Sequence, residues 1–243
     1  MHSHNNDAHA DNTATTQTII TLDGVSVCYG QDCALKDASL SVDEGDFVAI
    51  TGPNGGGKTT LLKVILQLIK PSSGHVSFKH DGHEVKSLEI GYLPQKNAID
   101  PRYPITVEEV VASGMLGKKK LWKRLDNSDR VRVDETLELV GLNDMRHHSI
   151  GTLSGGQLQR ALLGRAVISN PPVLAMDEPL SYVDKQFEPR LYEIIRQLSQ
   201  NATILLVSHE MTEISAMANK HIIVDRTLHL CHADHHFFRS ECE

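Results

Sequence analysis

GPNGGGKTT (residues 52–60) is the most informative stretch of this chain. It follows a short apolar run, FVAIT, which predicts a buried strand, and it opens the run KTTLLKVILQLI, which has the spacing of an amphipathic helix. Its residues fit G-x-x-x-x-G-K-[ST], a pattern whose glycines let backbone N–H groups curl around a phosphate. The sequence therefore predicts a phosphate-binding loop between a strand and a helix.

This loop, called the phosphate loop below, supplies the groups that a nucleoside triphosphate needs. Lys58 can reach the β- and γ-phosphates, and the hydroxyl of Thr59 can bind Mg²⁺. The N-terminus of the helix adds partial positive charge. We therefore expect the nucleotide to be bound by Gly52, Pro53, Asn54, Gly55, Gly56, Gly57, Lys58, Thr59 and Thr60.

A second apolar run, VLAMDEP (residues 173–179), ends in two adjacent carboxylates. Asp177 ends the run, where a carboxylate can hold the water shell of Mg²⁺. Glu178 follows at once, placed to orient or deprotonate an attacking water. An acidic turn at the end of a strand is the alternative, but its pairing with a phosphate loop favours a nucleotide site.

Other strand-like runs, with helical patterns between them, are TIITLDGVSVCYG, GHVSFK, SLEIGYLP, NATILLVSH and KHIIVD. The near-continuous apolar runs predict strands buried on both faces of a mostly parallel sheet, and the alternation predicts an α/β fold. Residues 96–153 break this pattern, because TVEEVVASGML and DRVRVDETLELVGL predict helices and no convincing strand lies between them. We expect a helical subdomain inserted into an α/β core.

Composition and charge exclude some classes of protein. The 243 residues are 40% hydrophobic, enough for one substantial core with a subdomain, and the formal net charge of −7 gives no reason to expect nucleic-acid binding. No apolar run approaches the roughly 18–20 residues that span a bilayer. The N-terminus lacks the apolar core of a secretory signal, so a cytoplasmic location is expected.

The cysteines predict no disulfide framework. Four of them in a chain of this length, Cys28, Cys33, Cys231 and Cys242, are expected to be free thiols in a reducing compartment. Cys28 and Cys33 have no second close Cys or His pair to complete a zinc site, so we interpret them as structural.

TLSGGQLQR (residues 152–160) identifies a family. Alone, Ser154 and the two glycines would be an ordinary helix start, with the serine as its cap. Shortly before VLAMDEP, the stretch resembles the signature motif of ATP-binding cassette (ABC) ATPases. The resemblance runs from about residue 18 to residue 232 and implies a P-loop NTPase core of ABC type, with an antiparallel β portion beside the mostly parallel sheet.

Other elements occur in the order that this family shows. Tyr29 in CYG resembles the aromatic residue that stacks on adenine, and SYVD, ending at Asp184, resembles the D-loop. Gln95 in YLPQ resembles the glutamine that senses Mg²⁺ and the attacking water, and His209 in LLVSHE resembles the switch histidine that contacts the γ-phosphate. The resemblance thus implies the catalytic residues Glu178, His209 and Gln95, and Mg²⁺ held through Thr59, Gln95 and Asp177.

The family's dimer implies a role for the signature motif. Two cassettes close head-to-tail around two ATP molecules, so Ser154, Gly155, Gly156 and Gln157 would contact the γ-phosphate bound by a second copy of the chain. The start of a helix at Ser-Gly-Gly is itself suited to an anion. The D-loop departs from the family pattern, because Tyr182 and Val183 stand where small residues are common, and this bears on the interface rather than on catalysis.

The resemblance also divides the chain. The expected parts are a disordered polar tail (1–16), the first part of the nucleotide-binding core (17–95), a helical subdomain with the signature motif (96–158), the second part of the core (159–230) and a short His/Cys-containing tail (231–243).

A transport function follows by resemblance. DRTLHLCHADHH, taken with ITVEEVVASG and the phosphate loop, resembles the cassettes of zinc, manganese and iron(II) uptake systems. This implies a separate membrane permease, an extracytoplasmic metal-binding protein, and a place on the inner face of the cell membrane. An ATPase for another small solute, and a soluble ABC ATPase of iron–sulfur cluster assembly, remain alternatives.

Three segments carry open interpretations. PITVEEVVASGM (residues 104–115) is either a docking surface for the permease or simple core packing. KKKLWKR (residues 118–124) is either close to anionic lipid or a solvated loop. His229 and Cys231 share one face of a predicted strand and, with His232, His235 and His236, could form a metal site or only bind metal weakly.

Overall fold

The computed structural model describes residues 17–95, 104–116, 125–209 and 212–231. Its strands are β1 (Thr18–Tyr29), β2 (Asp32–Asp43), β3 (Phe47–Thr51), β4 (Ser73–His80), β5 (His83–Val85), β6 (Ile90–Leu93), β7 (Val173–Asp177), β8 (Thr203–Val207), β9 (Lys220–Asp225) and β10 (Thr227–Cys231). Its helices are α1 (Lys58–Ile65), α2 (Val107–Ser113), α3 (Asn127–Leu139), α4 (Gly155–Val167), α5 (Glu188–Ser199) and α6 (Thr212–Met217), with short 3-10 turns η1 (Asn143–Met145) and η2 (Ile150–Thr152). The predicted α/β fold is confirmed.

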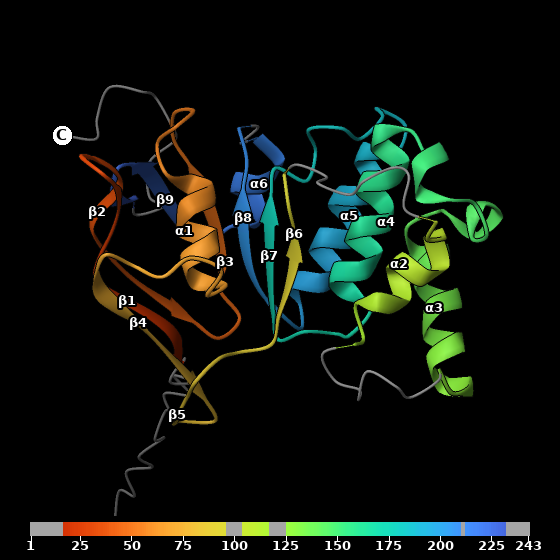
Figure 1. Cartoon of the computed structure of the whole chain (residues 1–243), viewed down its shortest axis with the longest axis horizontal. Helices are drawn as coiled ribbons and strands as arrows, with labels where there is room; N and C mark the ends of the chain where they lie inside the picture. Colours follow the sequence, from red (N-terminus) through yellow and green to blue (C-terminus); the bar gives the residue numbers. More distant parts are fainter. Residues whose placement is uncertain (1–16, 96–103, 117–124, 210–211, 232–243) are drawn as a thin grey trace, which may run out of the picture.

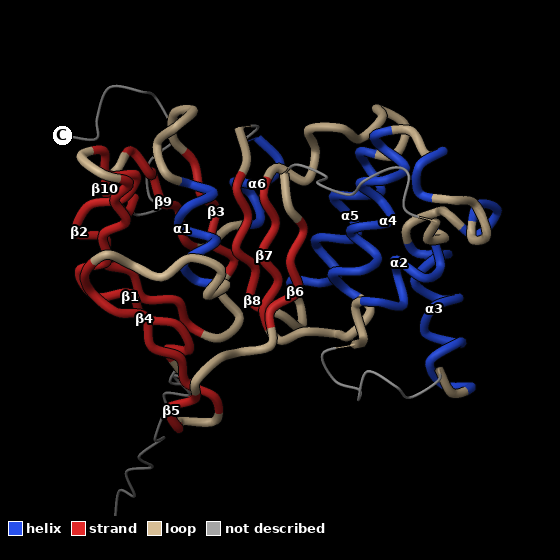
Figure 2. Tube along the Cα trace, viewed as in Figure 1, coloured by secondary structure: helices blue, strands red, loops and turns tan. Residues whose placement is uncertain are grey.

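A six-stranded sheet forms the centre of the molecule, in the order β10-β9-β3-β8-β7-β6 (Figure 2). Its strands are parallel except for β10, which pairs antiparallel with β9. β7 and β8 are buried at every position. Continuous apolar runs such as VLAM and TILLV are what a strand covered on both faces requires.

The two faces of this sheet lie in two different cores. Val48 and Ile50 of β3 pack with α1 and the antiparallel strands, whereas Phe47 and Ala49 pack with α4 and α5. The separation follows from the alternation of side chains along a strand. Figure 1 shows the resulting layers, with α1 between the two sheets and α4 and α5 on the other face of the central sheet.

A four-stranded antiparallel sheet, β2-β1-β4-β5, forms one end of the molecule. We predicted β1 and β4, but we predicted no strand for β2. Its sequence, DCALKDASLSVD, looks polar, yet Leu35, Ala38, Leu40 and Val42 are buried on one side of it. Packing against α1 and the central sheet buries these positions, and charged and serine residues occupy the exposed ones.

The expectation of free thiols is wrong for Cys28 and Cys33, which form a disulfide. The antiparallel register of β1 and β2 places the two residues directly opposite one another. Because β2 was not predicted, this pairing could not be inferred from the sequence. The residues are structural, as we expected, but through a covalent bond across a hairpin.

The helical end of the molecule consists of α2, α3 and the start of α4 (Figure 1). Thr106 caps α2 and Asp126 caps α3, each in a reciprocal capping box. Val107, Val110 and Val111 are buried in the core that contains α4, so the apolar spacing of residues 104–115 reflects core packing. Of the two interpretations of this segment, packing is the one that these side chains support.

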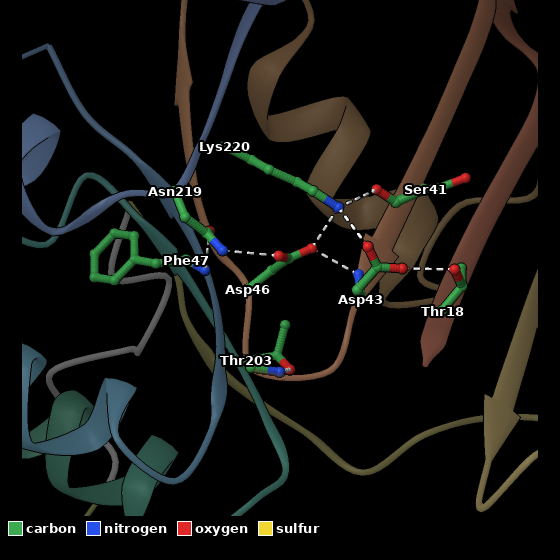
Figure 3. Close-up of polar contacts among 9 residues, drawn as sticks. Thr18, Ser41, Asp43, Asp46, Phe47, Thr203, Asn219 and Lys220 are labelled. Carbon is green, nitrogen blue, oxygen red and sulfur yellow. Dashed lines mark hydrogen bonds and ion pairs between the residues drawn. The ribbon is translucent and has the colours of Figure 1, made fainter. Parts of the chain in front are cut away.

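An ionic network joins the two sheets (Figure 3). Lys220 Nζ, at the start of β9, lies 2.8 Å from Oδ2 of Asp43 and 2.7 Å from Oδ2 of Asp46. Asn219 donates to Asp46 Oδ1 over 3.0 Å and accepts from the amide of Phe47 over 2.8 Å. The network fixes the turn between β2 and β3, from which the strand that leads to the phosphate loop begins.

Some predictions concern residues outside the described ranges: the polar tail 1–16, the basic run 118–124, and His232, His235 and His236. The predicted strand that carries His229 and Cys231 is confirmed as β10. Among the described residues, His, Cys, Asp and Glu side chains form no group of three or more that could hold a metal ion. No helix in these ranges has both the length and the apolar character to cross a membrane.

Candidate nucleotide site

The phosphate loop runs from the carboxyl end of β3 into α1. Gly52 and Gly57 have φ values of 135° and 105°, a region that side chains other than glycine rarely adopt. A Cβ atom at Gly57 would also collide with the carbonyl oxygen of Ala34 on β2, and one at Gly52 with that of Val224 on β9. The loop is therefore held closely between two strands, and both glycines are required.

Lys58 closes this loop from within. Its Nζ donates to the carbonyl oxygens of Gly52 and Pro53, each over 2.9 Å. Burial lowers the pKa of the ammonium group, and the charges of Glu178 and Asp177 partly offset this effect. The first turn of α1 contains no acidic residue, so the positive end of the helix is not neutralised. The loop thus presents a cation and a free helix N-terminus to an anion.

Asp177 and Thr59 meet as predicted. The hydroxyl of Thr59 donates to Oδ2 of Asp177 over 2.7 Å, although 118 positions separate them in the sequence. Oδ1 of Asp177 is buried and has no hydrogen-bond partner within the described part of the chain. Burial raises the pKa of Asp177, and the bond from Thr59 offsets only part of that rise. A buried carboxylate with an unused oxygen beside a hydroxyl fits the oxygen ligands that Mg²⁺ prefers.

Glu178 has an unusual backbone and three side-chain partners. Its φ of 52° is in the left-handed region, which is strained for glutamate, and its amide donates to the carbonyl of Val207 over 3.0 Å. Oε1 lies 2.9 Å from Nε2 of His209, and Oε2 accepts from the hydroxyl of Ser181 over 2.8 Å. The side chain of Gln95 makes the third bond. The structure therefore brings together all three residues predicted to be catalytic.

These partners control the charge of Glu178. Burial alone would raise its pKa, but the hydrogen bonds from Ser181 and Gln95, together with the charge of His209, outweigh burial and lower it. The carboxylate stays ionised and can accept a proton or a hydrogen bond from water. Ser181 was not among the predicted site residues, although it is the first residue of SYVD, the stretch that contains the predicted Asp184.

The signature motif begins α4. Ser154 accepts from the amide of Gln157 over 3.2 Å, and the side chain of Gln157 accepts from the amide of Ser154 over 2.8 Å. This capping box gives a hydrogen-bond acceptor to the backbone amides of both Ser154 and Gln157. Among the described residues, no hydrogen bond or ion pair joins residues 154–157 to the phosphate loop. The sequence prediction that these residues serve a second copy agrees with this separation.

The D-loop, residues 181–184, lies against the signature motif. A Cβ atom at Gly156 would come within 2.8 Å of the carbonyl oxygen of Tyr182, and one at Gly155 within 3.9 Å of the Tyr182 ring. Asp184 accepts from the amide of Phe187 over 2.9 Å and so holds the turn before α5. Tyr182, the departure from the family pattern, is exposed beside the two signature glycines.

Tyr29 ends β1 with its side chain 61% exposed, as a stacking platform for a base requires. It lies in the hairpin that the disulfide closes. Ala34 and Leu35 of β2 lie against Gly57 of the phosphate loop. The amide of Arg226 donates to the carbonyl of Gly56 over 2.8 Å. Arg226, at the turn between β9 and β10, carries no motif, and we did not predict this contact.

The chain resembles known proteins along most of its length. A sequence model of the ABC transporter family matches residues 35–181. The high-affinity zinc uptake system ATP-binding protein ZnuC of Bacillus subtilis is 38% identical over 211 residues, which cover 86% of this chain and 91% of that protein. The zinc uptake system ATP-binding protein ZurA of Listeria monocytogenes is 39% identical over 222 residues, covering 87% of this chain and 86% of that protein.

Solved structures support the same assignment. The dimeric structure of a bacterial ABC transporter cassette is 26% identical, with a TM-score of 0.77, and covers 90% of this chain and 100% of that one. A cassette in a dimeric post-hydrolysis state, bound to ADP and Pi, is 26% identical, with a TM-score of 0.78. Together with the phosphate loop, the paired carboxylates and the signature helix, these likenesses show that the chain belongs to the ABC transporter family and is one of its ATP-binding, ATP-hydrolysing cassettes.

Proposed function

We propose that this chain is the ATP-hydrolysing subunit of an importer for a divalent metal ion (zinc, manganese or iron) and that a separate membrane permease carries the ion. The observation that supports catalysis most directly is the cluster of Glu178, His209 and Gln95 beside the Thr59–Asp177 pair. In this proposal the chain works on the inner face of the cell membrane, attached through the permease.

Each residue of the cluster has a role in hydrolysis. The ionised carboxylate of Glu178 orients the attacking water and accepts its proton as the oxygen approaches the γ-phosphorus. Gln95 and Ser181 hold that carboxylate, and His209 lies where it can contact the γ-phosphate. Lys58 exchanges the loop carbonyls for phosphate oxygens, and the amides of the phosphate loop support the β-phosphate.

Thr59, Asp177 and Gln95 are the residues that would hold Mg²⁺. When bound, the ion supplies positive charge to the phosphate oxygens as negative charge develops on them. Tyr29 provides the face on which adenine stacks. The proposal therefore assigns Tyr29 to the base, Lys58 and the loop amides to the phosphates, and Thr59, Asp177 and Gln95 to the metal.

The signature motif completes the site of a second copy. Within the described part of the chain, Ser154, Gly155, Gly156 and Gln157 make no hydrogen bond to their own phosphate loop, and they start a helix whose first turn carries no acidic residue. In a head-to-tail pair, this helix faces the γ-phosphate held by the other copy. The dimeric cassettes among the similar structures support this arrangement.

The metal substrate is supported by the names of similar proteins, which are ATP-binding proteins of zinc uptake and zinc import systems in several bacteria. In this proposal the chain powers transport and does not select the ion. Selection then belongs to the permease and to an extracytoplasmic metal-binding protein.

The test is metal uptake in cells in which Glu178→Gln replaces the native residue. We expect loss of uptake of one metal, while a Glu84→Gln control, at an exposed position on β5, leaves uptake intact. Uptake of zinc, manganese and iron at the normal rates would contradict metal import. Copurification of the chain with soluble scaffold proteins, and not with a polytopic permease, would instead support iron–sulfur cluster assembly.

A further inference from the structure

Gln159, in the second turn of α4, has a buried amide without partners. The residue is 1% exposed, and neither Nε2 nor Oε1 has a hydrogen-bond partner among the described residues. A glutamine amide offers two donors and an acceptor, and native structures rarely leave such a group unpaired inside the protein. This residue was not among those predicted from the sequence.

Water cannot satisfy this amide in the conformation described. The space that Gln159 lines is enclosed mainly by apolar side chains and leaves no room for a water molecule. Its other walls include Leu93, Pro179, Val183, Phe187 and Leu191. The unpaired amide is therefore a property of how these segments are packed.

The segments around Gln159 are the moving parts expected of an ATP site. Leu93 stands two residues before Gln95, Pro179 follows Glu178, and Val183 belongs to the D-loop. Gln159 is itself three residues beyond Gly156, on the same side of α4, where the backbone of Tyr182 and Asp184 lies. One side chain thus contacts the segment of the catalytic glutamate, the D-loop and the signature helix.

An unsatisfied buried amide raises the free energy of the conformation that contains it, whereas an apolar side chain of the same shape would not. A conformation that offers the amide a partner is favoured by comparison. Arg160 also lines this space, and its Nε is buried without a hydrogen-bond partner among the described residues, but its guanidinium is held over the Phe187 ring and donates to the carbonyl of Gly141. The other polar groups beside the amide are the backbone C=O groups of residues 179–184 and the N–H groups of residues 180–184, since this segment packs against both Gln159 and the first turn of α4.

We propose that Gln159 is a positioning residue that favours the ATP-joined dimer: its amide pairs with the backbone of residues 179–184 when the signature motif meets the second copy's ATP. The pairing couples the signature helix, which serves one ATP site, to Glu178, which directly precedes residues 179–184 and serves the other ATP site. This inference rests on the proposed head-to-tail dimer.

The test uses Gln159→Leu, which keeps the volume and removes the amide. It is made in the Glu178→Gln background, so that ATP is bound but not turned over, and ATP-driven dimerisation is measured by analytical ultracentrifugation. We expect the thermal midpoint without nucleotide to be unchanged or higher, ATP binding to the monomer to be unchanged, and dimerisation to be weaker by about tenfold. With Glu178 intact, kcat should fall while KM for ATP stays the same.

Two further variants make the result decisive. Leu191→Met changes the packing of the same space without touching a polar group and should dimerise like the parent. Gln159→Met serves if the leucine variant is poorly folded. A lower thermal midpoint in both Gln159 variants, or failure of both to fold, would assign the amide an ordinary structural role and overturn the proposal.

The two proposals fail in distinguishable ways. If the Glu178→Gln parent does not dimerise with ATP, the head-to-tail dimer is wrong, and the role of Gln159 is lost with it. If the parent dimerises and Gln159→Leu dimerises equally well, only the role of Gln159 is wrong.

Discussion

Oε1 of Glu178 lies 2.9 Å from Nε2 of His209. The contact exists because β7 and β8 are parallel neighbours in register, with Asp177 beside Val207, so the residues that follow the two strands emerge at the same edge of the sheet. The parallel sheet thus brings two motifs 31 positions apart into contact.

Glu178→Gln should leave ATP binding intact and reduce turnover by orders of magnitude, because the amide cannot accept the proton of the attacking water. Steady-state hydrolysis and equilibrium ATP binding together check this expectation. Glu84→Gln is the matched control, since its side chain is exposed on β5. Normal turnover in the Glu178→Gln protein would remove Glu178 from the catalytic role.

Asp177→Asn should weaken the binding of Mg-ATP without lowering the stability of the ligand-free protein. Burial raises the pKa of Asp177 in the folded chain, so its ionised form opposes folding at neutral pH, and removing the charge relieves that cost. Without ligand, we expect a thermal midpoint that is unchanged or higher. Mg-ATP at a hundred times its Kd should raise the free energy of unfolding of the native chain by about 3 kcal/mol, and in the variant most of this stabilisation should be lost.

Thermal melts with and without Mg-ATP measure both effects. Asp144→Asn, at an exposed position in η1, is the control and should keep the full response to Mg-ATP. A lower midpoint without ligand would show that the charge of Asp177 stabilises the fold, contrary to the direction argued from its burial.

Ser181→Ala should move the acidic limb of the kcat profile to higher pH. The hydroxyl of Ser181 donates to Glu178 and helps to hold the pKa of that carboxyl below its usual value. Without this bond the pKa rises, so protonation and loss of activity begin at a higher pH. Ser199→Ala, whose hydroxyl bonds to a carbonyl on α5, should leave the profile unchanged.

Lys220→Met should lower the free energy of unfolding by about 2–3 kcal/mol, since it leaves the nearly buried Asp46 without its cation. Chemical denaturation measures the change. Lys70→Met, at an exposed loop position, is the control and should change stability by less than about 0.5 kcal/mol.

Lys220→Met should also change how the stability of the protein depends on pH. Burial would raise the pKa of Asp43, but the bonds from Lys220 and Thr18 lower it below the unfolded value. Asp43 therefore adds stability above its unfolded pKa, and this contribution disappears as the pH falls through its lowered value. Stability of the Lys220→Met protein should consequently depend less on pH across this acidic range. An equal dependence in both proteins would contradict the role of Lys220.

The sequence by itself determined the features that depend on neighbouring residues. The phosphate loop, the carboxylates after VLAM and the capped start of the signature helix are each defined within a few positions, where glycine geometry, charge and strand or helix periodicity act locally. For that reason the α/β class was predictable, whereas the roles of the ATP-site residues and the domain limits stay predictions.

Only the tertiary structure decided the features that need two distant segments to meet. The sequence of β2 looks polar, and its strand is recognisable only in the folded chain, where one side of it is buried. Its pairing with β1 brings Cys28 to Cys33. The contacts of Ser181 with Glu178 and of Arg226 with Gly56 exist for the same reason. These contacts depend on the register and packing of whole strands and helices, which no local pattern of residues encodes.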